Sequence, residues 1–111
     1  MDRWTSQFPW DNYPWFTLGM TRAVLCQSLQ GIEDDHLHCF PASNRDPKAA
    51  AVLANIRAAR AANNSGDIES AIDLIDGLWC FYHNRGLYSI ASRCIRVSNI
   101  RFHVPLKHAV S

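Results

Sequence analysis

The stretch DPKAAAVLANIRAARAANNSG, residues 46–66, restricts the possible folds more than any other part of the sequence. Asp46 can accept hydrogen bonds from free amides at a helix N-terminus, and Pro47 suits the first helical turn, where its missing N–H group costs nothing. Alanine, the strongest helix former, occupies eight of the next fifteen positions and lets a neighbouring helix approach closely. The sequence therefore predicts a packing helix that ends before Gly66. Its core stripe comprises Val52, Leu53, Ile56 and Ala59.

The chain before this helix is expected to hold a first helix and a long loop. The helix should begin near Pro14 and end at Gly31, because proline favours a helix start and glycine a helix end. Its inward stripe comprises Leu18, Val24, Leu25 and Leu29. Residues 31–46 are predicted to form a loop, and loops of that length inside a compact domain are usually functional or disordered.

A third helix is predicted over residues 68–84, because Asp67 can cap its first amides and Gly86 follows its end. Apolar side chains cover about half of its circumference at about 100° per residue, which is typical of a central helix packed by several neighbours. The predicted core positions are Ile68, Ala71, Ile72, Leu74, Ile75, Leu78, Trp79, Phe81 and Tyr82. The opposite side carries Glu69, Asp73, Asp76, Cys80 and His83.

A fourth helix is predicted over residues 87–96. Its inward face comprises Leu87, Ala91, Cys94 and Ile95, and the opposite face carries Arg85, Arg93 and Arg96. Past Val97 the apolar residues alternate in NIRFHV, a pattern that predicts a short strand or extended segment ending at Pro105.

The length and composition predict one globular domain. At 111 residues the chain is long enough for one modest core and too short for two. Hydrophobic residues make up 48% of the chain and charged residues 19%, which is unlike a disordered protein. We therefore predict a mainly α-helical, compact single domain of about four helices. It comprises an aromatic-rich N-terminal arm over residues 1–13, a helical body over 14–104 and a flexible tail over 105–111.

Targeting signals are not expected from the sequence. The first sixteen residues contain two aspartates, two prolines and no apolar run, so neither a signal peptide nor a transit sequence is predicted. No stretch approaches the roughly 20 apolar residues that a membrane-spanning helix needs. We therefore expect a cytoplasmic protein without a membrane partner, whose four cysteines are reduced thiols or metal ligands rather than disulfides.

Two short motifs mirror each other, HLHC at residues 36–39 and CFYH at residues 80–83. Thiolates and imidazoles are the usual zinc ligands, and each motif supplies both. The candidate ligands are Cys80 and His83, with Cys39 and either His36 or His38. About forty residues separate the two pairs, which does not match a compact zinc finger, so surface histidines and a shallowly buried thiol are the alternative. We expect no cofactor, with zinc as the alternative.

Aromatic residues concentrate at the N-terminus, where six of the twelve fall within the first sixteen residues. Tryptophan and tyrosine contribute most per residue to protein interfaces, and this segment has no helical or strand period that would bury them together. The candidate partner-binding residues here are Trp4, Phe8, Trp10, Tyr13 and Trp15. The alternative is that the segment folds back over the alanine-rich helix.

Acidic and basic residues segregate along the chain. Asp73 and Asp76 belong to an acidic stretch, and no acidic residue follows Asp76. Arg93, Arg96 and Arg101 make the C-terminal third basic. We expect both groups to recognise a protein partner. Nucleic-acid binding by the basic C-terminal helix is the alternative, although the acidic side of the preceding helix would repel DNA.

No sequence signature of an enzyme is present. The chain lacks GxSxG, Walker, GxGxxG and HExxH motifs, and a small helical domain seldom forms a deep active-site pocket. We predict a non-enzymatic binding protein of adaptor or inhibitor type that occludes or bridges a macromolecular partner. A homodimer is compatible with the alanine-rich helix face and the surplus of aromatic residues. In size and in its lack of enzyme motifs, the chain resembles inhibitors and adaptors that phages and plasmids encode.

Overall fold

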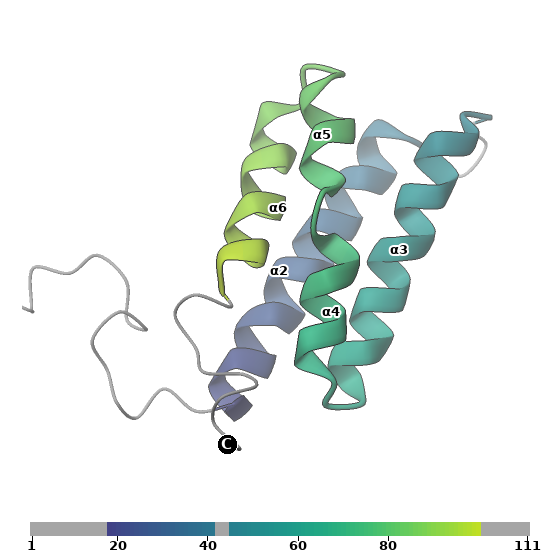
Figure 1. The fold of residues 1–111 in the computed structure, drawn as a ribbon. Helices are drawn as coiled ribbons and strands as arrows, with labels where there is room; N and C mark the ends of the chain where they lie inside the picture. Colours follow the sequence, from purple (N-terminus) through teal and green to yellow (C-terminus); the bar gives the residue numbers. More distant parts are fainter. Residues whose placement is uncertain (1–17, 42–44, 101–111) are drawn as a thin grey trace, which may run out of the picture.

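The helices of this protein run side by side in a bundle (Figure 1). The computed structural model describes residues 18–41 and 45–100. Helix α2 spans Leu18–Cys39, α3 Pro47–Asn64, α4 Ile68–Ile75, α5 Leu78–His83 and α6 Tyr88–Asn99. Because α4 and α5 follow each other end to end, these five helices occupy four positions in the bundle. The prediction of a mainly α-helical, compact single domain of about four helices is confirmed, whereas the predicted arm and tail lie outside the described residues.

Helix α3 forms as its sequence predicts. Asp46 accepts a hydrogen bond from the backbone N–H of Lys48 at 2.9 Å, and Pro47 is the first helical residue. Val52, Ile56 and Ala59 are buried, and Leu53 is partly buried. The small side chains of α3 allow it to pack against both α2 and α4. Asp67 caps α4 in the same way, accepting a hydrogen bond from the Ser70 backbone N–H at 3.1 Å.

Helix α2 is longer than predicted, and the prediction of a loop from residue 31 is wrong for residues 31–39. The helix continues through HLHC to Cys39 because its last turns bury Ile32, Glu33 and His36 against neighbouring helices. A glycine within a helix, here Gly31, lowers the stability of the fold by about 1 kcal/mol. The burial of the Ile32 side chain stabilises the fold by roughly 2 kcal/mol and therefore outweighs this loss. The predicted stripe is confirmed at Leu25 and Leu29, while residues 14–17 lie outside the described part.

The predicted third helix is interrupted, so one continuous helix over residues 68–84 is wrong. The backbone leaves helical geometry at Asp76, with φ −60° and ψ 129°, and Gly77 adopts φ +87°. This left-handed conformation is accessible to glycine and costs other residues roughly 1–2 kcal/mol. Tyr82 is buried as predicted, whereas Trp79, which follows the interruption and was also predicted to lie in the core, is 37% exposed.

Helix α6 extends further than predicted. Residues 98–100 are not extended, because α6 continues to Asn99 and Ile100 follows it in a 3₁₀ turn. Val97 and Ile100 are both buried, so the helical conformation keeps an apolar face on the core up to this point. Residues 101–104 of the predicted strand lie outside the described chain.

The core receives side chains from every helix of the bundle. Leu29, Ile56, Ile72, Tyr82 and Cys94, one from each of α2 to α6, have no exposed surface. Within the described ranges, none of the helices is long and apolar enough to cross a membrane.

Candidate functional site

The HLHC and CFYH motifs lie against each other, but they meet through aromatic rings and not through thiols. His36 of α2 is 1% exposed, and its Nδ1 atom lies 2.7 Å from the hydroxyl oxygen of Tyr82 in α5. The ring of Phe40 lies 4.8 Å from that of His36 and 5.4 Å from that of Phe81, measured between centroids. These four residues form the His36 cluster, which joins the end of α2 to α5.

Burial keeps both partners of this hydrogen bond neutral. The removal of His36 from water lowers the pKa of its imidazole, because the charged form loses its hydration. Burial likewise raises the pKa of the Tyr82 hydroxyl. A neutral hydroxyl can donate to a neutral imidazole nitrogen, so the His36–Tyr82 contact is a hydrogen bond between uncharged groups.

The candidate zinc ligands are not assembled. His38, Cys39, Cys80 and His83 are exposed, whereas His36 is buried and hydrogen-bonded to Tyr82. Among residues 18–41 and 45–100, no group of three or more histidine, cysteine, aspartate or glutamate side chains could hold a metal ion. The two motifs therefore meet through His36, Phe81 and Tyr82, and the exposed Cys39, Cys80 and His83 are not part of this contact.

All four cysteines are free thiols. Cys26, Cys39 and Cys80 are exposed. Cys94 lies in the core, where burial raises the pKa of its thiol to about 12, so it remains protonated and packs as a small apolar side chain.

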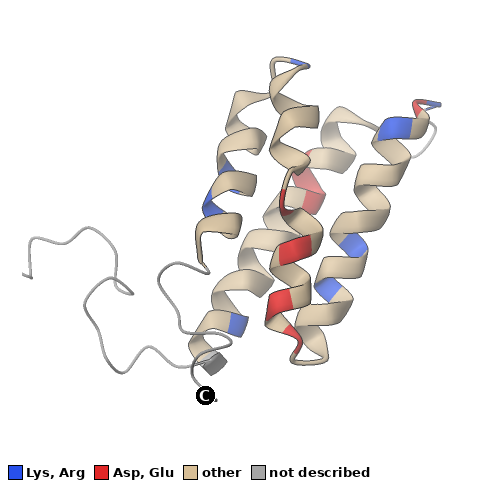
Figure 2. Ribbon diagram, in the orientation of Figure 1, with Lys and Arg blue, Asp and Glu red and all other residues tan. Residues whose placement is uncertain are grey.

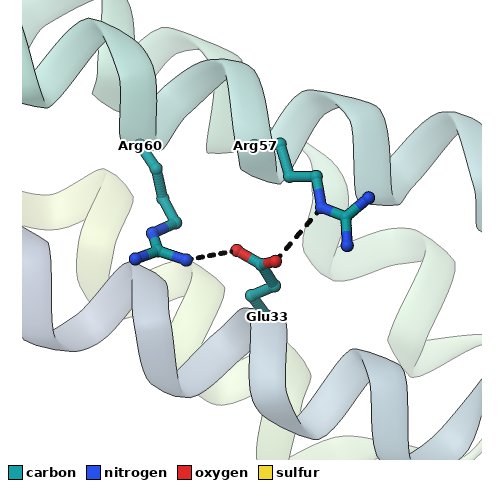
Figure 3. A network of polar contacts seen from close by, with 3 residues as sticks. All are labelled: Glu33, Arg57 and Arg60. Atoms are coloured by element: carbon teal, nitrogen blue, oxygen red, sulfur yellow. Dashed lines mark hydrogen bonds and ion pairs between the residues drawn. The ribbon is translucent and has the colours of Figure 1, made fainter.

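A buried carboxylate ties α2 to α3 (Figure 3). Glu33 accepts hydrogen bonds from Arg60 at 2.6 Å and from Arg57 at 3.1 Å. The hydrogen bond from Arg60 lowers the pKa of the Glu33 carboxyl, burial opposes this shift, and the hydrogen bond from Arg57 adds to it. Both arginines are thus engaged in holding the bundle together.

The predicted basic surface is smaller than the sequence indicates. Arg93 forms an ion pair with Asp35 of α2. Arg85 pairs with Asp46 at 3.0 Å, and its guanidinium lies 3.9 Å from the centroid of the Phe81 ring. Arg96 is exposed and makes no ion pair within the described residues, and Arg101 lies outside them.

The predicted acidic residues lie on the surface of the α4 segment (Figure 2). Asp73 and Asp76 are exposed, and Asp76 occupies the junction between α4 and α5. The interruption of the helix at this junction separates them from Cys80 and His83, so the single helical stripe that the sequence predicted is not formed. The candidate aromatic residues Trp4, Phe8, Trp10, Tyr13 and Trp15 lie outside the described residues.

An exposed aromatic cluster lies where α5 turns into α6. The ring of His83 contacts that of Trp79 at 5.8 Å and that of Tyr88 at 5.0 Å between centroids, both edge to face. A hydrogen bond of 2.9 Å from the Leu87 N–H to the Tyr82 carbonyl closes the turn between the two helices. Trp79 is 37% exposed and Tyr88 is 62% exposed. We call Trp79, His83 and Tyr88 the hairpin cluster.

The helical pattern did not predict this cluster, because an uninterrupted helix places Trp79 in the core and no motif singles out Tyr88. The Asp–Gly dipeptide at residues 76–77 is a turn signal that could have revealed it, since a break there changes the helical phase of every residue that follows. Aromatic side chains with a polar atom combine a large apolar surface with hydrogen-bonding capacity, which is typical of protein interfaces.

Comparison of the chain with known protein families, with curated proteins and with solved structures finds no match. The fold and the surface define a small α-helical bundle with an exposed aromatic cluster on one of its helical hairpins.

Proposed function

We propose that this chain is a non-enzymatic binding protein that holds another protein on the outer surface of the α5–α6 hairpin. The observation that carries the proposal is the exposed contact of Trp79, His83 and Tyr88. Tryptophan and tyrosine are the side chains most often found at the energetic centres of protein interfaces. The rings support one another edge to face, so little side-chain entropy is lost when a partner covers them.

The proposal keeps the adaptor or inhibitor role expected from the sequence, in which binding occludes or bridges the partner. The charged residues Asp76 and Arg96 are exposed on the segments next to the cluster and would orient the partner. The N-terminal aromatic residues remain candidates for a second contact with the same partner.

Nucleic-acid binding has less support than protein binding. Two of the four arginines assigned to the basic surface, Arg85 and Arg93, are neutralised by carboxylates of the same chain. Among residues 18–41 and 45–100, these ion pairs leave fewer free cations on that surface, and cations that displace counterions supply most non-specific affinity for nucleic acids.

Site-specific photo-cross-linking in cells that naturally produce the protein tests the proposal. A photoreactive phenylalanine analogue at position 88 retains the aromatic ring and should give a discrete cross-linked protein product. Asn55, exposed on α3, provides the matched control position. We expect the product at position 88 to be absent at position 55 and to be lost when Trp79→Ala is added. The same products at both positions, or a product that Trp79→Ala leaves unchanged, would show that the cluster is not a binding surface.

A further inference from the structure

One surface of the α5–α6 hairpin carries most of the large apolar side chains that are exposed in the described chain. These side chains are Met20, Trp79, Tyr88 and Ile95, and all but Met20 belong to the hairpin. Tyr88 and Ile95 lie seven residues apart on α6, which is about two helical turns, so they share one side of the helix. Together with His83, which contacts Trp79 and Tyr88, these three residues form what we call the hairpin face.

Residues of opposite charge lie near the hairpin face, with acidic positions at the α4–α5 junction and basic positions on α6 (Figure 2). Asp76 is exposed and immediately precedes α5. On α6, Arg93 turns toward α2, where it pairs with Asp35, and Arg96 lies one turn later on the same side. Tyr88, in contrast, turns toward α5. The hairpin face is therefore flanked by an exposed acidic residue at the α4–α5 junction and by an arginine on the side of α6 that lies away from α5.

We infer that the hairpin face binds the same face of a second copy of the chain, about a two-fold axis that runs along the hairpin between α5 and α6. Because this pairing names the partner of the surface proposed above to bind protein, it rests on that proposed function. In a two-fold interface, each residue pair occurs twice, with the roles of the copies exchanged. Arg96 of each copy then faces Asp76 of the partner subunit, and the apolar side chains meet at the centre.

The charge pattern favours a second copy over a partner of one sign. An acidic partner would meet Asp76 and a basic partner would meet Arg96, and like charges opposite each other weaken binding. A second copy presents both charges in complementary order. Arg85 and Arg93 are already paired within the chain, whereas neither Asp76 nor Arg96 takes part in an ion pair among residues 18–41 and 45–100.

Exchange of the edge charges tests this pairing directly. Asp76→Arg and Arg96→Asp each place like charges opposite one another in a homodimer, and we expect either change to raise the dissociation constant about tenfold or more. When the two variants are mixed, opposite charges face each other at both edges, so a heterodimer should form with about the wild-type affinity. Sedimentation equilibrium with one variant fluorescently labelled measures both affinities. If Asp76 and Arg96 interacted within one copy instead of between two copies, mixing the variants would restore nothing. The experiment therefore distinguishes a contact between copies from a contact within one copy.

Truncation of the aromatic residues tests the centre of the same interface. Trp79→Ala should raise the dissociation constant by about 30-fold or more, as expected for a tryptophan that becomes buried at an interface centre. Tyr88→Ala provides a second variant, because the Tyr88 side chain is 62% exposed and its loss leaves the core intact. Asp34→Arg makes the same charge change as Asp76→Arg, but at an exposed position on α2. It is the matched control for that variant and should leave self-association unchanged. Thermal melting by circular dichroism verifies that each variant is folded.

Two results would overturn self-association through the hairpin face. One is a single species of 12.6 kDa at every concentration up to about 1 mM. The other is a dimer that neither the charge exchanges nor Trp79→Ala weakens, because such a dimer uses another surface. If the protein is a monomer but position 88 still cross-links a different protein, and Trp79→Ala abolishes that product, self-association is ruled out and the proposed function is retained. If the protein is a monomer and that cross-linked product is absent, both self-association and the proposed function are ruled out.

Discussion

Replacement of Tyr82 by phenylalanine tests whether the His36 cluster stabilises the fold. The change removes one hydroxyl from a fully buried side chain and leaves His36 Nδ1, 2.7 Å away, without its partner in the core. An unsatisfied buried polar atom costs about 1–3 kcal/mol. We therefore expect the free energy of unfolding to fall by about 1–3 kcal/mol, with little further loss from packing because only one oxygen atom is removed.

Urea denaturation followed by far-ultraviolet circular dichroism measures this change. The midpoint should fall while the slope of the transition stays constant, since a constant slope indicates that the surface exposed on unfolding is the same. In thermal melting, each kcal/mol corresponds to about 4–8 °C for a domain of this size. A melting temperature at least about 4 °C below that of the unmodified protein is therefore expected.

Tyr88→Phe is the matched control, because it removes the same hydroxyl from a side chain that is 62% exposed. Its effect should stay within about 0.5 kcal/mol, as is usual for surface substitutions. Equal stabilities of the two variants would refute the reasoning, since they would mean that the His36–Tyr82 hydrogen bond contributes nothing to the stability of the folded chain.

Three further predictions concern stability and use the same unfolding measurement. Burial lowers the pKa of His36 below its ordinary 6.5, so the unfolded chain binds a proton at a higher pH than the folded chain does. The free energy of unfolding should therefore fall as the pH drops from about 7 to 5.5, by at most about 1.4 kcal/mol. His36→Gln should remove this pH dependence, and an unchanged pH dependence in the variant would contradict the assignment to His36. Glu33→Gln should lower the free energy of unfolding by about 1–2 kcal/mol, because it weakens the ion pairs with Arg57 and Arg60. The control Asp34→Asn, at an exposed site, should lower it by less than about 0.5 kcal/mol. Similar losses in the two variants would show that these ion pairs do not stabilise the fold. Gly77→Ala should lower the free energy of unfolding by about 1–2 kcal/mol, because the backbone at this position has a positive φ. Gly31→Ala should raise it by about 0.5–1 kcal/mol, because Gly31 is helical and the added Cβ meets only an ordinary contact at 3.5 Å. Changes of the opposite sign would show that backbone conformation does not determine the effect of these two substitutions.

Local signals were sufficient to predict α3 and the start of α4. Asp46, Pro47 and Asp67 act through hydrogen bonds and backbone geometry within a few residues, so their sequence context contains the whole cause. The core stripe of α3 follows from the same regular helix. Predictions of this kind succeed because no distant part of the chain has to be known.

The extent of α2 could not be predicted in this way. Gly31 and the polar residues after it resemble a helix end, but Ile32 and His36 are buried, and the hydrogen-bond partner of His36 is Tyr82 of α5, 46 residues further along the chain. The zinc hypothesis failed to identify the actual contact for the same reason. The two motifs were paired only as candidate zinc ligands, whereas the contact between them is made by His36 and Tyr82 and depends on the direction in which the His36 side chain enters the bundle.

The missed helix interruption and the missed candidate site have one physical cause. In an uninterrupted helix, Trp79 would follow Ile72 by seven residues and Ile75 by four, and would share their buried side. The left-handed Gly77 breaks this register, so that Trp79 turns outward, whereas Tyr82 stays in the core, where the uninterrupted register would also place it. The conformation at Gly77 therefore accounts for the exposed aromatic surface, and the same short helix α5 carries Tyr82 into the His36 cluster. A substitution at Gly77 should for this reason affect protein binding and stability together, whereas Trp79→Ala should affect binding far more than stability.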